Sequence, residues 1–420
     1  MPDTQRDVVV DKAGAGRLVM SLLLLFVVPS FLFVFFKLSS LAPGLLLACM
    51  CILAINIRGL LGFRVSAAGI LMFAFMFGGA FAFGAYAYLS AGESKSLISL
   101  LFFFVIAVAV LLGQSIVNYD FCIFNRALIF VLITLILLGW LKLFWQPSFL
   151  GYENYSKPVF PFSEESHYSL FLGIIACGVI VNLSVFASIF LILNMLVLAV
   201  LMPNLTLLLF SCICCFLFLL RIRLLYLWGV LIVALALLGC FLYFFLLENE
   251  YFKNRLDFSG ADNLTALVFL QGWALAYSNF IGTSGFGLGF QMLGSNFTYL
   301  PEISEIIYRH AGQYFNVADA GFLAAKLIAE LGVLGLLLSI FYLFLLFSVI
   351  FSMNYWLRRS STLDSVEGVI VKNYVAVGGI VFGFLVEFFF RGLGYFSPGV
   401  FLFFVALTVY LKSRTFLRRI

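Results

Sequence analysis

The chain has 420 residues, of which 64% are hydrophobic and only 10% are charged. A soluble domain carries about 25% charged residues, so this composition excludes an ordinary soluble protein. The formal net charge is only +5, and no nucleic-acid partner is expected. Repeated apolar runs of about 20 residues predict an all-α polytopic membrane protein. The runs are continuous rather than alternating, which argues against a membrane-spanning β-barrel.

Breaks at charged residues, proline and glycine divide the chain into about twelve predicted transmembrane helices. The two shortest lie between Tyr168 and Leu201, where only Asn182-Leu183-Ser184 separates them. The N-terminal segment lacks the pattern of a cleaved signal peptide, so we expect the first helix to be retained. In chain order, the predicted helices cover residues 18–36, 41–57, 66–89, 97–117, 127–144, 168–183, 185–201, 204–220, 224–247, 321–352, 373–390 and 398–411.

Lysine and arginine predict the orientation of these helices, because cytoplasmic segments are enriched in both. With twelve helices and cytoplasmic N- and C-termini, fifteen of the 24 basic residues lie on the cytoplasmic side. These fifteen are Arg6, Lys12, Arg17, Arg58, Arg64, Arg126, Arg221, Arg223, Arg358, Arg359, Lys372, Lys412, Arg414, Arg418 and Arg419. Removing either short helix would place Arg221 and Arg358 on the side opposite the basic N-terminus. The charge pattern therefore favours a count of twelve.

The predicted organisation is a single membrane domain over residues 1–420. Nine helices occupy 18–247, a large outer loop with short helices occupies 248–320, three helices occupy 321–411, and a cytoplasmic tail follows at 412–420. No proline- or serine-rich linker and no internal repeat divides the chain.

The eight cysteines lie within or at the ends of apolar runs, which favours a packing role over disulfide formation. Cys212, Cys214 and Cys215 are close in sequence, but no histidine or carboxylate accompanies them. We therefore expect no metal site and no cofactor.

A shorter outer segment ends in the polar sequence Phe162–Tyr168, FSEESHY. Ser163 is suited to a helix N-cap, and carboxylates in a first turn suit the helix dipole. One interpretation is an ordinary capped helix start. The other is that Glu164, Glu165 and His167 face an outward cavity, in which a carboxylate accepts a proton from a sugar hydroxyl.

Lys253 and Arg255 lie near the start of the large outer loop, against the general bias of basic residues toward the cytoplasm. Cations beside the membrane suit a phosphate or diphosphate at the lipid surface, and arginine can bind such a group through two hydrogen bonds. The alternative interpretation is a charged flank that stops membrane insertion.

The same loop contains the glycine-rich sequence Gly282–Gly294, GTSGFGLGFQMLG. It is too short and wrongly placed for a dinucleotide-binding fingerprint, and it has no lysine of the Walker type. Gly287 and Gly289 instead allow either a tight turn or a close approach of the backbone to a ligand.

Two charged pairs lie in the last predicted helices. Lys326 and Glu330 are four residues apart and therefore share one helix face, and Glu387 and Arg391 repeat this spacing at an outer helix end. Ionisable residues within membrane helices are candidates for function. For each pair, a structural salt bridge and the lining of a cavity are both open.

These motifs, in this order, resemble the bacterial O-antigen polymerase family (the Wzy type) within the wider O-antigen polymerase/ligase superfamily. The resemblance covers most of the chain by topology, but its motifs are confined to about residues 150–335. Phe162–His167 resembles the family motif F-x-E-P-S-x, with Glu165 in place of proline, and Lys253–Arg255 resembles the arginine that opens the large loop. Phe286–Phe290 resembles the G-x-G-x-x turn. Asp319–Phe322, followed by Glu330–Gly335, resembles the D-x-G and E-x-G-x-x-G ending. A second loop arginine is missing at Asp262–Thr265, and Arg309 is the available substitute.

The resemblance implies a glycosyltransferase in the bacterial inner membrane, with its active site and large loop on the periplasmic side. Such an enzyme polymerises oligosaccharide repeat units carried on undecaprenyl diphosphate, and the diphosphate leaving group replaces a nucleotide sugar as the energy source. Implied partners are lipid-linked glycans, membrane lipid, a chain-length regulator and a flippase.

By the same resemblance, Glu164 or His310 would deprotonate the acceptor hydroxyl, and Asp319 would be a further catalytic residue. Cations would hold the leaving diphosphate. The residues expected to bind the diphosphate or the rest of the substrate are Lys253, Arg255, Arg309, Arg391, His167, Glu165, Gly287, Gly289 and Glu330.

Two other functions compete with this one. An O-antigen ligase would transfer the finished glycan to the lipid A–core. Ligases, however, place a His-Asn or His-Ser pair shortly before the final motif, where this chain has Asp319-Ala320-Gly321. A transporter of lipid-linked glycans would spread charge along the middle of several helices, whereas the charges here gather at outer helix ends and in one large loop.

Overall fold

The computed structural model of the protein describes residues 12–60, 67–117, 121–221, 263–359 and 365–417. Within these ranges the chain is helical, apart from loops and one isolated β-bridge between Val159 and Phe162. The helices are α1 (Lys12–Phe35), α2 (Ala42–Leu60), α3 (Ala67–Ala91), α4 (Lys95–Ile98), α5 (Leu101–Val117), α6 (Phe121–Phe144), the 3₁₀ turn η1 (Tyr152–Asn154), α7 (Glu165–Ile180), α8 (Val185–Leu201), α9 (Leu205–Arg221), α12 (Leu264–Gly282), α13 (Glu302–Ala311), α14 (Leu323–Leu331), α15 (Val333–Arg359), α16 (Ser365–Gly383), α17 (Leu385–Phe389) and α18 (Pro398–Leu417).

Six helical segments in the described ranges are long and apolar enough to cross a membrane. They are Gly14–Phe35, Lys95–Val117, Ile123–Phe144, Val333–Arg359, Glu367–Phe389 and Pro398–Leu417. Shorter apolar helices of 10–17 residues accompany them, including α7, α8 and α9. The helical class and the membrane character predicted from the sequence are thus confirmed. The count of twelve stays a prediction, and the predicted helix 224–247 lies outside the described residues.

The turn between α7 and α8 falls where the sequence has Asn182-Leu183-Ser184. α7 ends at Ile180 and α8 begins at Val185. Ser184 caps α8, because its Oγ accepts a hydrogen bond from the Ala187 amide at 3.3 Å. The weakest of the predicted breaks therefore has a defined local cause.

The predicted helix 321–352 is wrong as a single element. The structure divides it into α14 and α15 at Gly332, which has a φ of +57°. A side chain there would be strained by this backbone conformation and would also overlap the Gly285 carbonyl. The break separates a short helix that carries Lys326 and Glu330 from the long apolar helix α15.

α7 forms the centre of the bundle. Every residue from Tyr168 to Ile180 is buried, and the helix packs against α6, α9 and α16. A helix that is apolar on all sides is expected in the interior rather than at a surface. The Tyr168 hydroxyl donates to the Leu135 carbonyl of α6 at 2.9 Å, which fixes the end of α7 that carries Glu164 and His167.

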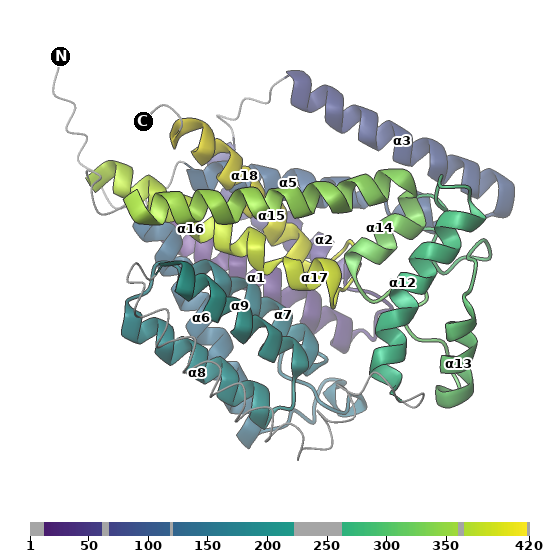
Figure 1. Cartoon of the computed structure of the whole chain (residues 1–420), viewed down its shortest axis with the longest axis horizontal. Coiled ribbons are helices and arrows are strands. Elements are labelled where there is room, and N and C mark those ends of the chain that lie inside the picture. The colour runs from purple at the N-terminus through teal and green to yellow at the C-terminus, as the bar shows by residue number, and fades with distance from the viewer. Residues whose placement is uncertain (1–11, 61–66, 118–120, 222–262, 360–364, 418–420) are drawn as a thin grey trace.

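The two described helices of the predicted outer loop, α12 and α13, lie with α14 at one end of the bundle (Figure 1). α12 packs on α14, with Trp273 and Phe269 against the ring of Phe322 at centroid distances of 4.9 and 5.4 Å. The predicted loop therefore contains a 19-residue helix, α12, that packs on the element carrying the charged pair.

Candidate functional site

The loop between α17 and α18 contacts two groups of charged residues, one at α7 and one at α14. This return loop, residues Phe390–Ser397, connects α17 to α18, and α17 packs on α14. The Gly392 amide donates to the Gly321 carbonyl at 2.7 Å, so the loop is fastened to the start of α14. From this position the return loop reaches one group of charged residues at α7 and another at α14.

The first group is the Glu164 cluster, formed by Glu164, His167 and Arg391 with Ser163 and Ser166. Arg391 Nη2 lies 3.4 Å from Glu164 Oε2. The same carboxylate oxygen accepts a hydrogen bond from the Ser166 hydroxyl at 3.0 Å and lies 3.9 Å from His167 Nε2. His167 Nδ1 is 3.1 Å from Ser163 Oγ. The carboxylate thus faces one permanent cation and one imidazole.

The helix begins one residue later than the predicted Ser163 cap implies. Glu164 occupies the N-cap position of α7, with extended backbone and no capping hydrogen bond from its side chain. Because its carboxylate does not turn back to the first-turn amides, it is directed to Arg391 instead. Ser163, freed from capping, contacts His167. The N-cap carboxylate of α7 is therefore available for contacts outside its own helix.

Glu164 is ionised near neutral pH. Partial burial alone raises the pKa of this carboxyl, but the Arg391 guanidinium and the Ser166 hydrogen bond lower it, and the net pKa lies below its usual value. Burial lowers the pKa of His167 to about 4, so its imidazole is uncharged near neutral pH. About half of the Glu164 side chain, 51%, is exposed, and 36% of Arg391 is exposed. Both charged groups are therefore accessible from outside the bundle.

The second group is the Lys326 cluster, formed by Asp319, Lys326 and Glu330. The Lys326 ammonium is almost fully buried, with 1% of its side chain exposed, and lies 2.7 Å from Asp319 Oδ1 and 3.7 Å from Glu330 Oε1. It also donates to the Ala318 carbonyl at 2.8 Å. The predicted pairing of Lys326 with Glu330 is confirmed, and Asp319 is a second and closer partner that its spacing did not indicate.

Glu330 uses its remaining hydrogen-bonding capacity to hold the glycine-rich segment. Its carboxylate accepts from the Gln291 amide at 2.9 Å and from the Leu293 amide at 3.2 Å. Lys95, at the start of α4, donates to the Leu293 carbonyl at 3.2 Å. The buried carboxylate is thus a structural centre that joins α14 to the outer loop, as expected for a charge that is hydrogen-bonded as well as paired.

Asp319 is the accessible member of the Lys326 cluster, with 54% of its side chain exposed. Partial burial alone raises the pKa of Asp319, but the nearby Lys326 ammonium lowers it by more, so the net pKa is below its usual value. The return loop covers the cluster on one side. A side chain at Gly394 would come within 2.9 Å of Asp319 Oδ1, and the Lys326 ammonium lies 5.3 Å from the centre of the Tyr395 ring.

The glycine-rich segment packs on protein backbone. The Leu288 amide donates to the Ala329 carbonyl at 3.0 Å, and the Gly289 amide donates to the Glu330 carbonyl at 2.8 Å. Gly287 has a φ of +79°, and a side chain on it would overlap the Glu330 carbonyl. Of the two sequence-based interpretations, the tight turn is thus confirmed, whereas contact with a ligand stays a prediction.

The other predicted site residues lie apart from both clusters or outside the described ranges. Arg309 and His310 are exposed in the last turn of α13, and no described contact joins them to either cluster. Glu165 is partly buried in the first turn of α7. Lys253 and Arg255 lie outside the described residues.

Of the two interpretations of Glu387 and Arg391, the salt bridge is wrong, because α17 ends at Phe389 and the chain leaves the helix before Arg391. Arg391 then turns to Glu164, while Glu387 accepts a hydrogen bond from Ser397. Lys95 and Tyr395 were missed as neighbours of Lys326. No sequence signal could have indicated Lys95, because 198 positions separate it from its partner Leu293.

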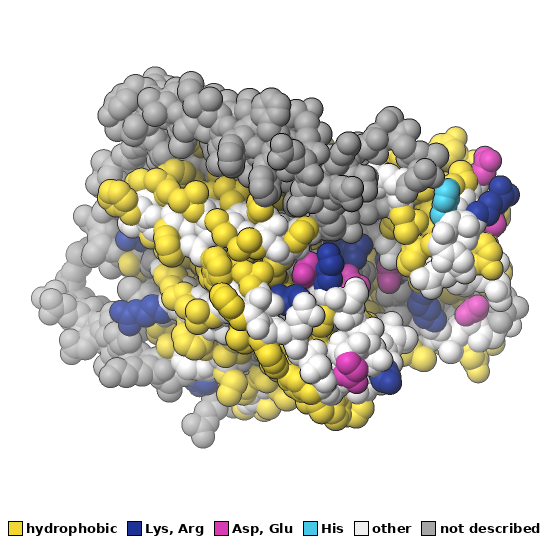
Figure 2. All heavy atoms as spheres, turned by 90° about the horizontal axis from the view of Figure 1, so that it is seen from below, with side chains coloured by type: hydrophobic (Ala, Val, Ile, Leu, Met, Phe, Trp, Pro, Cys, Tyr) yellow, Lys and Arg dark blue, Asp and Glu magenta, His cyan; other side chains and the backbone are white. Residues whose placement is uncertain are grey.

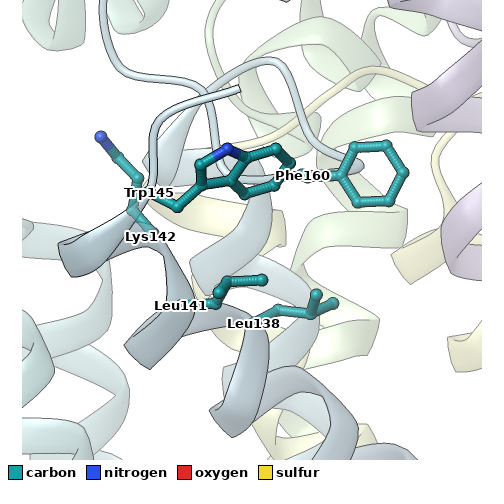
Figure 3. A pocket seen from close by; sticks show the side chains of 5 residues that line it. All are labelled: Leu138, Leu141, Lys142, Trp145 and Phe160. Carbon is teal, nitrogen blue, oxygen red and sulfur yellow. The ribbon is translucent and has the colours of Figure 1, made fainter. Parts of the chain in front are cut away.

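Figure 2 shows acidic and basic side chains gathered in the middle of one face, with hydrophobic side chains around them. A separate shallow surface depression lies at the C-terminal end of α6, lined by Leu138, Leu141, Lys142, Trp145 and Phe160 (Figure 3). It contains none of the predicted site residues. The two clusters, rather than this depression, are therefore the candidate site.

The chemistry available in the candidate site is that of carboxylates and cations. In the described part of the chain, no three histidine, cysteine or acidic side chains are grouped as metal ligands would be. In comparisons with known proteins, no protein-family model, no curated protein and no solved structure matches the chain.

Proposed function

We propose that the protein is a glycosyltransferase of the inner membrane that polymerises oligosaccharide repeat units carried on undecaprenyl diphosphate, as O-antigen polymerases do. The observation that carries this proposal is the meeting of Glu164 and Arg391 in an accessible cluster. One residue can accept a proton and the other can hold an anionic leaving group. These are the two tasks that transfer of a sugar from a lipid diphosphate requires.

In the proposed reaction, a hydroxyl oxygen of the acceptor glycan attacks the anomeric carbon of the donor glycan. The bond from that carbon to the diphosphate breaks, and undecaprenyl diphosphate leaves with the bonding electrons. The hydroxyl proton passes to a base, for which Glu164 is the first choice because its carboxylate is ionised and half exposed. Arg391 binds the diphosphate through its planar guanidinium, and Arg309, Lys253 and Arg255 are further proposed cations.

His310 is the second candidate for the base. His310 is exposed on α13 beside Arg309, and no described contact joins it to Glu164 or Arg391. Asp319, the accessible acid of the Lys326 cluster, is suited to hydrogen-bonding sugar hydroxyls, since a carboxylate is an acceptor with two oxygens. Glu330 and the glycine segment that it holds would form the support behind Asp319.

The proposal includes a topology of twelve transmembrane helices with both termini in the cytoplasm and the two clusters facing the periplasm. Fifteen of the 24 basic residues support this orientation. Labelling of single introduced cysteines with a membrane-impermeant reagent tests it. Sites near Glu302 should react from outside intact cells, and sites near Arg358 should react only after permeabilisation.

Deletion of the gene, followed by electrophoresis of the surface polysaccharide, tests the activity. A polymerase predicts single repeat units on the core, and this result supports the proposal. Absence of glycan on the core would indicate an O-antigen ligase, and loss of all outward-facing intermediates would indicate a transporter of lipid-linked glycans. Either of these two results contradicts the polymerase proposal.

A further inference from the structure

Glu387 is a fully buried carboxyl group at the end of the bundle that carries the site. It belongs to α17, next to the return loop, and its side chain is 0% exposed. No cation forms an ion pair with Glu387 among the described residues. α18 passes so close that a side chain at Gly399 would overlap Glu387 Oε2. An acidic side chain in this position is costly to the fold unless its charge is removed or compensated.

The hydrogen bonds of Glu387 lead to the far end of the return loop. The Ser397 hydroxyl donates to Glu387 Oε1 in a short hydrogen bond, and Ser397 Oγ accepts from the Val400 amide at 2.9 Å. Ser397 therefore caps the start of α18 and contacts Glu387 with the same hydroxyl group. Glu387 Oε2 has no hydrogen-bond partner among the described residues.

Among the residues that the structure describes, the groups that face Glu387 from neighbouring helices are uncharged. Tyr342 of α15 donates its hydroxyl proton to the Val381 carbonyl at 2.9 Å, and Cys177 of α7 lies against Gly383. α18 contributes Gly399, and α7 also contributes Ile174, which lies near Gly399. None of these supplies a positive charge, so a carboxylate at Glu387 would be a buried, uncompensated charge.

We propose that Glu387 is a proton-binding positioning residue, which holds the return loop in its working position as a neutral carboxylic acid. Its hydrogen bond to Ser397 links α17 to the last residue of the return loop, so the two ends of the loop are held at a fixed distance from each other. Within this closed segment, Arg391 reaches Glu164 and Tyr395 covers Lys326. The Ser397 hydroxyl could still donate to the ionised group, but loss of the proton places an uncompensated charge among apolar side chains. The return loop then opens because opening brings water to that charge.

The effect on polysaccharide rests on the proposed function, and three variants test it at matched expression. Glu387→Gln keeps the shape and neutrality of the acid and should retain polymer within about twofold of the wild type. Glu387→Ala and Ser397→Ala remove the bond and should each lower polymer by about tenfold or more. If E387Q is as damaging as E387A, or if E387Q fails to fold, the neutral-acid proposal is wrong.

A second measurement does not depend on any enzymatic activity. Leu393→Cys places a thiol in the return loop of the full-length protein, and its rate of reaction with a maleimide is followed in native membranes from about pH 6 to about pH 9. The same measurement in the E387Q background corrects for ionisation of the thiol itself. The rate for L393C alone, divided by the rate for L393C in the E387Q background, should be near one at the acidic end of the pH range. This ratio should rise by about threefold or more at the alkaline end.

The two measurements separate the inference from the proposed function. A rising ratio in a protein that proves not to be a polymerase supports the proton site and leaves only its substrate to be reassigned. A ratio that is flat across the pH range overturns the proton site, whatever the deletion phenotype shows.

Discussion

The guanidinium of Arg391 lies 3.4 Å from the carboxylate of Glu164, although 227 positions of sequence separate the two residues. Both side chains are partly exposed. An exposed ion pair contributes only about 0–1 kcal/mol to stability. The fold would therefore lose little without this pair, and the proposed function assigns the two groups a role on a substrate.

Arg391→Ala should abolish polymer formation, with a loss of about 100-fold or more, because the leaving diphosphate loses its cation. Arg391→Lys keeps the positive charge but loses the planar guanidinium, so its amount of polymer should lie between those of R391A and the wild type. Polymer is measured on gels at matched protein amounts, with exposed Arg358→Ala as the control variant. Normal polymer from R391A would rule out the proposed role of this arginine.

Glu164→Gln should reduce polymer by about 100-fold, whereas His310→Ala should leave at least about half of it. The reason is that Glu164 contacts Arg391, while His310 lies exposed on α13 away from both clusters. Exposed Glu302→Gln, also on α13, is the matched control for removal of one outer carboxylate. The opposite order of effects would make His310 the base and remove Glu164 from the mechanism.

Lys326→Ala should destabilise the protein by about 3–5 kcal/mol, because it leaves the buried Glu330 carboxylate without its cation. The double variant K326M/E330Q removes both charges while keeping a side-chain oxygen that can accept from the Gln291 or Leu293 amide, and it should recover part of this loss. Thermal unfolding in detergent measures both effects. An equal or larger loss in the double variant would show that the charges themselves do not determine stability here.

Gly287→Ala should lower stability by about 2 kcal/mol or more, since its backbone has a positive φ and the new methyl group would overlap the Glu330 carbonyl. Gly79→Ala is the control, because Gly79 lies in α3 with open space around its Cα. The substitution there should be neutral or slightly stabilising. Equal melting temperatures of the two variants would contradict the close packing of this turn.

The stability contributed by Asp319 should be lost only in acid. Its folded-state pKa is lowered, so its contribution is complete above the unfolded pKa of about 3.9 and disappears as the pH falls through the lower folded value. Because the side chain is half exposed, the contribution should not exceed about 1 kcal/mol. Asp319→Asn should lower the melting temperature at neutral pH. In strong acid, the melting temperatures of the variant and the wild type should lie closer together. A difference that is constant with pH would exclude this linkage.

The sequence was informative wherever the physical signal was local. Runs of apolar residues indicated the helices, and the short turn at Asn182–Ser184 was recognised from three residues. The four-residue spacing of Lys326 and Glu330 correctly indicated a pair. The same rule failed for Glu387 and Arg391, because spacing has meaning only while the helix continues, and α17 ends between them.

Apolar composition by itself determined that this protein is a helical membrane protein, since lipid leaves few other ways to satisfy backbone groups. Composition could not determine which charges meet. The turn at Gly332, the end of α17 at Phe389 and the fastening of Gly392 to Gly321 bring Arg391 to Glu164 and place the return loop beside Asp319. These contacts are made between helices that are distant in sequence, and only tertiary packing decides the distances between them.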